Sequence, residues 1–182
     1  MSPSEVDVGD ISAPIGKFQL SVNSVEDQTV HTLLLKQEGS ASDGDLINLR
    51  IRRLDGTPLT NVVSRTISDY ALFTFNAPFK LRQGDKVTLE VIADIVGGAS
   101  DTVRMRFEEE GDLYATGSRY GKGSQGKVYG SQVIVRSSPA APLLSIEAGK
   151  FTVETDGPTT KTYAPDSRDA LLANIRLTPG TE

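Results

Sequence analysis

The chain has 182 residues, with 19 Lys and Arg against 24 Asp and Glu, which gives a formal net charge of -5. It contains no Cys, no Trp and one His. These counts exclude disulfides, thiolate metal sites and a cysteine nucleophile, and a Ser-His-Asp triad would have to use His31. Because the chain is acidic and has no basic cluster, we expect no nucleic-acid partner.

The length allows one large domain, or one domain and part of another. No apolar run approaches the roughly 20 residues that a membrane-spanning helix needs, so we expect no membrane span. The opening residues Met1–Val6 have neither the basic nor the apolar stretch of a signal peptide. These features favour a cytosolic chain, or a mature or excised piece of a secreted protein.

Apolar and polar residues alternate with a period of two along most of the chain, which predicts half-buried β-strands. A short helical alternative exists at Ser167–Ile175, with Asp166 as its cap. In chain order, the strand-like runs lie near residues 18–22, 30–35, 46–53, 70–75, 87–93, 103–107, 133–135, 143–155 and 170–178.

Turn residues separate these runs. Asp55-Gly56 lies between the runs 49–51 and 59–63 and predicts a hairpin, because both positions tolerate positive φ. Short strands with turns every 8–12 residues or so are typical of a sandwich. We therefore predict an all-β fold, an Ig-like β-sandwich of Greek-key antiparallel sheets with extra C-terminal strands.

Two composition shifts indicate how the chain is organised. The Pro- and Ala-rich run Ser137–Pro142 predicts a linker, which gives an Ig-like module over residues 1–138 and a tail of linker and strands over 139–182. The tail is too short to bury its own core, so it begins a second module, packs back on the first module or is exchanged with a neighbour. The glycine-rich segment 117–130 lacks a phosphate-loop pattern and is interpreted as a surface loop, with a ligand or partner contact as the alternative.

The start and the end of the chain are weakly similar. Residues 170–178 align on residues 13–21 so that Ile175 falls on Phe18 and Leu177 on Leu20, 157 positions apart. The match is short, and both chance and homology remain open. If it is homologous, the chain is one module followed by the opening strands of the next, as in a tandem array.

Two stretches resemble a known family. They are TVHTLLLKQEGSASDGDLIN at Thr29–Asn48, continued by Leu49–Ile51, and the alternating stretch from Phe73 through Phe79 and Val87 to Ile95. Together they resemble the Ig-like β-sandwich repeats of large bacterial and archaeal cell-surface and S-layer-like proteins, mainly over residues 15–107. The resemblance implies extracellular, structural or adhesive modules and no catalytic residues. The arginine-bearing strands and the glycine-rich loop depart from it.

Acidic loop residues suggest a calcium site. Asp43-Gly44-Asp45 places two carboxylates on one loop, and Ca²⁺ prefers oxygen ligands. Asp94 and Asp101 are the residues that could join them in space. The alternative is an ordinary turn before the strand that begins near Leu46.

Three other groups of residues have side chains that could form a functional site. The run Glu108–Asp112 is interpreted as a solvated turn, with calcium or a basic partner patch as the alternative. A catalytic carboxylate pair is not favoured, since neighbours on a strand point to opposite faces. His31 is interpreted as a solvent-facing strand residue, because one His offers few nitrogen ligands. The arginines are expected on one sheet face opposite acids such as Glu90, or as a patch for acidic glycans; they are Arg50, Arg52, Arg53, Arg104 and Arg106.

The function predicted from these observations is a non-catalytic structural or adhesive module of an extracellular, cell-surface assembly such as a surface layer, fibre or filament. Its partners would be neighbouring copies or modules, with a homopolymer through the C-terminal strands as one form. The alternative is a calcium- or glycan-binding module whose site uses the loops 40–45, 96–101 and 117–130. No nucleophile–base pair or cofactor motif favours an enzyme, and calcium is the one cofactor that the sequence suggests.

Overall fold

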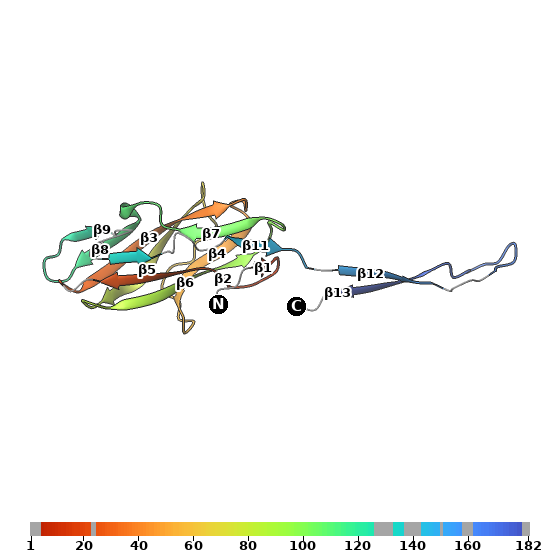
Figure 1. Ribbon diagram of the computed structural model, residues 1–182, viewed down its shortest axis with the longest axis horizontal. Helices are drawn as coiled ribbons and strands as arrows, with labels where there is room; N and C mark the ends of the chain where they lie inside the picture. Colours follow the sequence, from red (N-terminus) through yellow and green to blue (C-terminus); the bar gives the residue numbers. More distant parts are fainter. Residues whose placement is uncertain are drawn as a thin grey trace. The chain divides into compact units, whose positions relative to one another are not determined.

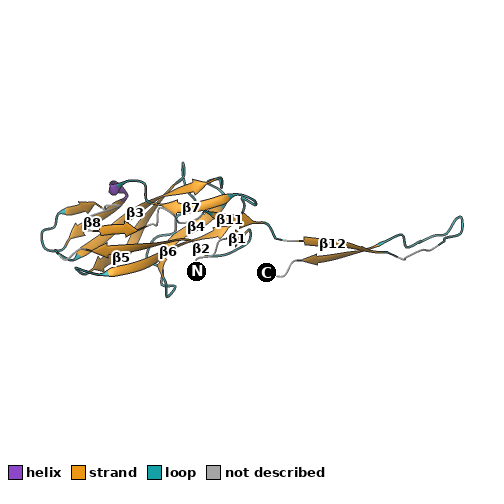
Figure 2. Cartoon of the chain, in the orientation of Figure 1, coloured by secondary structure: helices purple, strands orange, loops and turns teal. Residues whose placement is uncertain are grey.

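The computed structural model describes residues 5–22, 25–125, 133–136, 143–149, 151–157 and 162–179. These residues form β-strands joined by turns, with a 3-10 turn, η1, at Glu110–Asp112 as the helical element among them (Figures 1 and 2). The chain divides into two compact units, Met1–Glu147 and Ala148–Glu182. The prediction of an all-β fold is confirmed.

The larger sheet of the first unit is built around its long strand β3, and we call it the β3 sheet. Its strands follow the order β1-β11-β7-β3-β8-β9, and β5 pairs with the other edge of β3. One edge of β3 carries two partners in succession, because β8 pairs with Gln28–Leu33 and β7 with Lys36–Gly39. The bounds are β1 Glu5–Asp7, β3 Gln28–Gly39, β5 Tyr70–Leu81, β7 Thr102–Arg106, β8 Leu113–Gly117, β9 Gly123–Gln125 and β11 Leu144–Glu147.

The second sheet, the β2 sheet, follows the antiparallel order β10-β2-β6-β4. The pairing of β2 with β6 shifts register between Pro14 and Gly16, which marks a β-bulge near the start of β2. The bounds are β2 Ala13–Val22, β4 Leu46–Arg53, β6 Lys86–Ile95 and β10 Val133–Arg136.

Both sheets contribute their inward side chains to one hydrophobic core. Alternate residues of β2 are buried, among them Phe18 and Leu20, as are Leu33 and Leu35 of β3. Phe18 meets Phe107, which follows β7, edge-on at 5.4 Å between ring centroids. The two sheets therefore face each other as the layers of a sandwich, which is the arrangement that alternating strands require.

The segment between β4 and β5 closes one side of the sandwich. The predicted turn at Asp55-Gly56 is present, with Gly56 at a φ of +88°, and Leu59 returns to bond Ile51. Farther along, Val63 exchanges two backbone hydrogen bonds of 2.8 Å with Leu49 of β4, and Asn61 donates to Thr74 of β5 at 2.9 Å. The segment thus hydrogen-bonds to strands of both sheets.

The strand β11 corrects the predicted domain boundary. Leu144 and Ile146 are buried in the first unit, and β11 pairs with both β1 and β7. The predicted module ended at residue 138, with a continuous strand over 143–155, but the first unit ends at Glu147 and β12 (Phe151–Asp156) belongs to the second. The predicted linker 137–142 lies outside the described residues.

In the second unit, β12 pairs antiparallel with β13 (Asn174–Pro179). The helical alternative at Ser167–Ile175 is wrong, because Arg168 and Asp169 form a bend, residues 170–173 have no regular secondary structure and β13 begins at Asn174. Apolar residues of this unit, including Val153, Ile175 and Leu177, are exposed.

Candidate functional site

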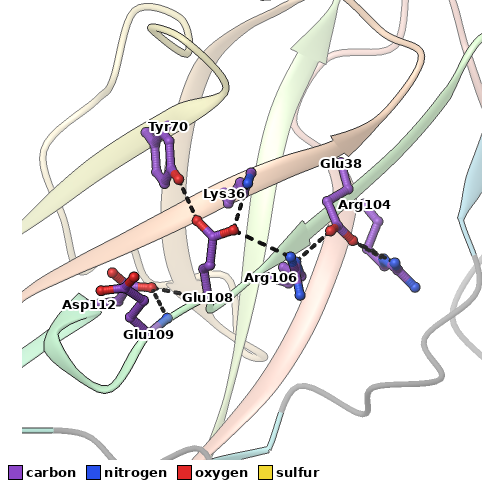
Figure 3. Close-up of polar contacts among 8 residues, drawn as sticks. All are labelled: Lys36, Glu38, Tyr70, Arg104, Arg106, Glu108, Glu109 and Asp112. Carbon is purple, nitrogen blue, oxygen red and sulfur yellow. Dashed lines mark hydrogen bonds and ion pairs between the residues drawn. The ribbon is translucent and has the colours of Figure 1, made fainter.

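The densest group of polar contacts among the described residues lies on the β3 sheet, over β3, β5 and β7 (Figure 3). We call it the β3–β7 charge cluster. The strand pairing explains it, because Lys36 lies opposite both Tyr70 and Arg106, and Glu38 lies opposite Arg104. Its members are Lys36, Glu38, Tyr70, Arg104, Arg106 and Glu108.

Two carboxylates hold this cluster together. Glu38 receives Arg104 at 2.5 Å and Arg106 at 2.6 Å. Glu108 receives Lys36 at 2.6 Å and Arg106 at 3.5 Å, and the Tyr70 hydroxyl donates to its other oxygen. Hydrogen bonds from Lys36 and then Tyr70 hold the pKa of Glu108 below its ordinary value. The cluster therefore crosslinks β5, β3 and the end of β7 electrostatically.

The acidic run is a turn, as one interpretation predicted. Asp112 Oδ2 accepts the backbone N–H groups of Glu108 and Glu109, each at 2.8 Å, around the turn η1. This fixes the turn that leads from β7 to β8 and sets Glu108 toward the cluster (Figure 3). Within this run, Asp112 therefore binds the backbone of the turn, whereas Glu108 binds side chains of the cluster.

A second row of charges crosses the β2 sheet. The carboxylate of Glu90 on β6 lies between Lys17 of β2 at 3.0 Å and Arg52 of β4 at 3.1 Å. Burial alone raises the pKa of Glu90, but the hydrogen bonds from Lys17 and Arg52 outweigh it and hold this pKa below its ordinary value. The predicted pairing of an arginine with Glu90 is confirmed.

The prediction that the arginines share one face is wrong. Arg50, Arg52 and Arg53 belong to β4 of the β2 sheet, whereas Arg104 and Arg106 belong to β7 of the β3 sheet. The alternation of a single strand cannot reveal this, because the assignment of strands to sheets is set by pairing between distant segments. A single basic patch made of all five residues is therefore not formed.

Asp43, the first residue of the calcium hypothesis, holds a neighbouring turn. Its Oδ1 accepts the Thr66 hydroxyl at 2.7 Å and the Asp69 N–H at 3.0 Å, and its Oδ2 accepts the Ser68 N–H at 2.9 Å. These bonds, that of Thr66 foremost, hold the pKa of Asp43 below its ordinary value. Ser68 and Asp69 both have positive φ, so the carboxylate stabilises a strained turn.

The other candidate calcium ligands accept hydrogen bonds from the protein or do not gather with Asp43. Asp45 accepts the N–H of Ser42 at 2.7 Å within its own turn. Asp94 accepts Ser12 N–H at 2.8 Å and the Asn48 side chain at 2.7 Å, and the backbone of Asp101 closes a turn with Gly98. In the described part of the chain, no three His, Cys, Asp or Glu residues gather as a metal site would require. The calcium site stays an untested prediction, and the protein hydrogen bonds that these carboxylates accept count against it.

The loops of the alternative ligand site do not meet at one place. The loops 40–45 and 96–101 lie together, since Val96 donates to the Asp45 carbonyl at 2.8 Å. The loop that begins at Gly117 starts opposite Gln28, at the other end of β3 from Gly39. At about 3.3 Å per residue, β3 separates these ends by more than 30 Å. Residues 126–130 of the glycine-rich segment lie outside the described residues.

The Gly117 end of the sandwich carries two features that the sequence did not single out. Glu26 accepts the N–H groups of Arg119 at 2.8 Å and Tyr120 at 3.3 Å beside an open depression. Gln28 is fully buried, and neither polar atom of its side chain has a partner within the described structure.

His31 is half-buried rather than fully solvent-facing, and its Nε2 lies 2.8 Å from the Thr116 hydroxyl.

Comparisons with known proteins assign no family. No family model matches the sequence, and neither a curated protein nor a solved structure matches it. Within the described residues, the structure has no helix of the length and apolarity that crossing a membrane takes.

Proposed function

We propose that the first unit is a non-catalytic structural module of an extracellular surface assembly, an Ig-like sandwich that acts through strand packing and contacts between modules. The observation that carries this proposal is the parallel pairing of its first and last strands. Glu5 lies opposite Ser145 and Asp7 opposite Glu147, and Figure 1 shows β1 beside β11. The resemblance over residues 15–107 supports the extracellular setting.

Parallel pairing fixes the direction of the chain through the module. The chain enters β1 and leaves β11 in the same direction, so tension along the chain pulls the two strands past each other. Hydrogen bonds between them are then loaded together instead of one after another. This suits a module that stands in a row with others and holds its shape under tension.

The anchoring of the two strands supports the same role. Val6 of β1 and Ile146 of β11 are buried in the core. Backbone bonds continue the pairing on either side, with Val8 donating to Glu147 at 2.9 Å and Ile146 to Asp101 at 2.8 Å. The β3–β7 charge cluster further ties β7, the neighbour of β11, to β3.

Protease treatment of intact cells of the source organism tests the location. We expect an antibody against the first unit to label intact cells, and added protease to remove the signal without lysis. A cytosolic protein serves as the control for lysis. Protection of the signal until the cells are lysed would contradict the proposal.

A further inference from the structure

The turn that leads into β2 recurs before β13. In the first unit, Gly9 has a φ of 111° and Ser12 a φ of 57°. Asp166 and Asp169 stand 157 positions later in each case, with φ values of 69° and 58°. Positive φ is uncommon outside glycine, so two such positions at one common offset are informative.

The hydrogen bond of this turn recurs at the same offset. Asp10 donates its N–H to the Asp7 carbonyl at 3.0 Å, and Ser167 donates its N–H to the Ala164 carbonyl at 3.2 Å. The backbone thus repeats over a stretch in which the two sequences share little. The repeat also extends the alignment seen in the sequence toward the N-terminal side, from residue 170 back to residue 164.

The apolar residues keep an irregular spacing in common. The buried residues of β2 skip one extra position between Ile15 and Phe18, directly after the β-bulge between Pro14 and Gly16. Their counterparts Leu172, Ile175 and Leu177 have the same spacing. Strict alternation would not produce it, so the shared irregularity supports a common register.

The two copies differ in exposure. Ile15, Phe18 and Leu20 are 2%, 4% and 0% exposed in the first unit. Leu172, Ile175 and Leu177 are 81%, 65% and 56% exposed in the second. Val153 of β12, paired with Leu177, is 58% exposed as well, so pairing with β12 leaves this face uncovered.

We infer that Thr162–Pro179 is a second copy of the β1–β2 segment, and that its exposed apolar face takes a sheet like the β3 sheet, from a further module of this fold. The interface it would form is the one that β2 makes with the β3 sheet in the first unit, where Phe18 meets Phe107. The inference deepens the proposed function and rests on it, because that function supplies the row of modules in which a further module follows this one.

The substitutions between the copies are compatible with that interface. Ala173 replaces Gly16, where an added Cβ would lie 3.6 Å from Met105, an ordinary contact. Arg168 replaces Ile11, an exposed residue. Two prolines do not transfer, because Pro179 replaces Val22 and Pro165 replaces Val8, whose N–H groups donate to the carbonyls of Asp85 and Glu147.

Grafting tests the inference in the full chain. In one variant, residues 162–178 replace residues 5–21 and Val22 is kept. In the matched control, residues 161–177 replace the same positions, which shifts the register by one and turns the counterparts of Phe18 and Leu20 outward. A third variant is the in-register graft with Val6, Val8, Lys17 and Phe18 restored. Tyr163 is larger than the buried Val6, and Pro165 lacks the N–H that Val8 donates to Glu147. Asn174 lacks the bond to Glu90, and Ile175 is smaller than Phe.

We expect the third variant to unfold cooperatively, with a melting temperature within roughly 15 °C of the parent, and the shifted control to lose its cooperative transition. The unrestored in-register graft should fall between them. Failure of both in-register grafts to fold would overturn the inference, as would equal stability of the in-register and shifted grafts.

These outcomes are separate from the test of the proposed function. A successful graft on a chain that proves to be intracellular would sustain the second copy and reject the surface role. A failed graft on a chain labelled at the cell surface would reject the second copy and sustain the surface role.

Discussion

Removing β11 should cost the first unit most of its stability. A chain that ends at residue 142 loses Leu144 and Ile146, which are 6% and 0% exposed. Burial of each such side chain contributes about 1.5–3 kcal/mol. The truncation also removes the backbone bonds of Val8 to Glu147, Ser100 to Ile146 and Ile146 to Asp101, each contributing about 0.5–1.5 kcal/mol.

The expected loss is therefore about 5–10 kcal/mol, comparable with the total stability of about 5–15 kcal/mol of a natural domain. Urea unfolding followed by circular dichroism measures it, with a chain ending at Glu147 as the matched control. The shorter chain should show no cooperative transition, or a greatly reduced midpoint. Equal stabilities within about 1 kcal/mol would refute the assignment of β11 to the first unit.

Three further predictions concern charge, backbone and metal. The pKa of Glu90 is lowered in the folded state, so its ionised carboxylate stabilises the fold at pH values above the ordinary glutamate pKa of about 4.3. This stabilisation is lost as the pH falls through the folded pKa. Glu90→Gln should therefore flatten the acid limb of the curve of stability against pH. Gly39→Ala should destabilise by about 3 kcal/mol or more, since Gly39 has a φ of 120° and a Cβ would lie 2.0 Å from the Thr102 carbonyl oxygen. Calcium and EDTA should leave the melting temperature unchanged, because Asp43, Asp45 and Asp94 accept protein hydrogen bonds.

Each of these has a control and a contrary result. The acid limb is measured from pH 6 downward to about pH 3, and an unchanged slope in Glu90→Gln would count against the row of charges. The control for Gly39→Ala is Gly56→Ala. Gly56 also has a positive φ, but no atom lies within 4 Å of the Cβ that alanine would add, so the free energy of unfolding should fall by only about 1 kcal/mol. A rise in melting temperature with calcium that Asp43→Asn abolishes would restore the calcium site.

Local pattern was sufficient to predict most of the strands. Phe18 and Leu20, or Val87 and Leu89, alternate with polar residues because one face of their strand is covered, and that signal lies in consecutive residues. The strand β11 was misassigned for the opposite reason. The partners of Leu144–Glu147 lie in β1 and β7, far away in the chain, and nothing in the run itself indicates them.

The charge pairs also divide into those that local sequence predicts and those that depend on distant segments. The alternation of β4 and β6 was enough to expect an acid such as Glu90 opposite an arginine. The contacts of Glu108 with Lys36 and Tyr70 depend on the register of β3 against β5 and on the turn after β7, so no local signal predicts them. Asp43 has the sequence context of a calcium ligand, but the Thr66–Asp69 turn it holds lies more than twenty residues away.

Pulling the first unit along its chain tests the structural role most directly. The chain has no Cys, so Ser4→Cys and Ala148→Cys give unique handles on either side of the β1–β11 pair. We expect one abrupt unfolding step, at a force that falls when Ile146→Ala weakens the anchoring of β11. Gradual extension without a step, or a force that Ile146→Ala leaves unchanged, would contradict a module built to hold tension through its first and last strands.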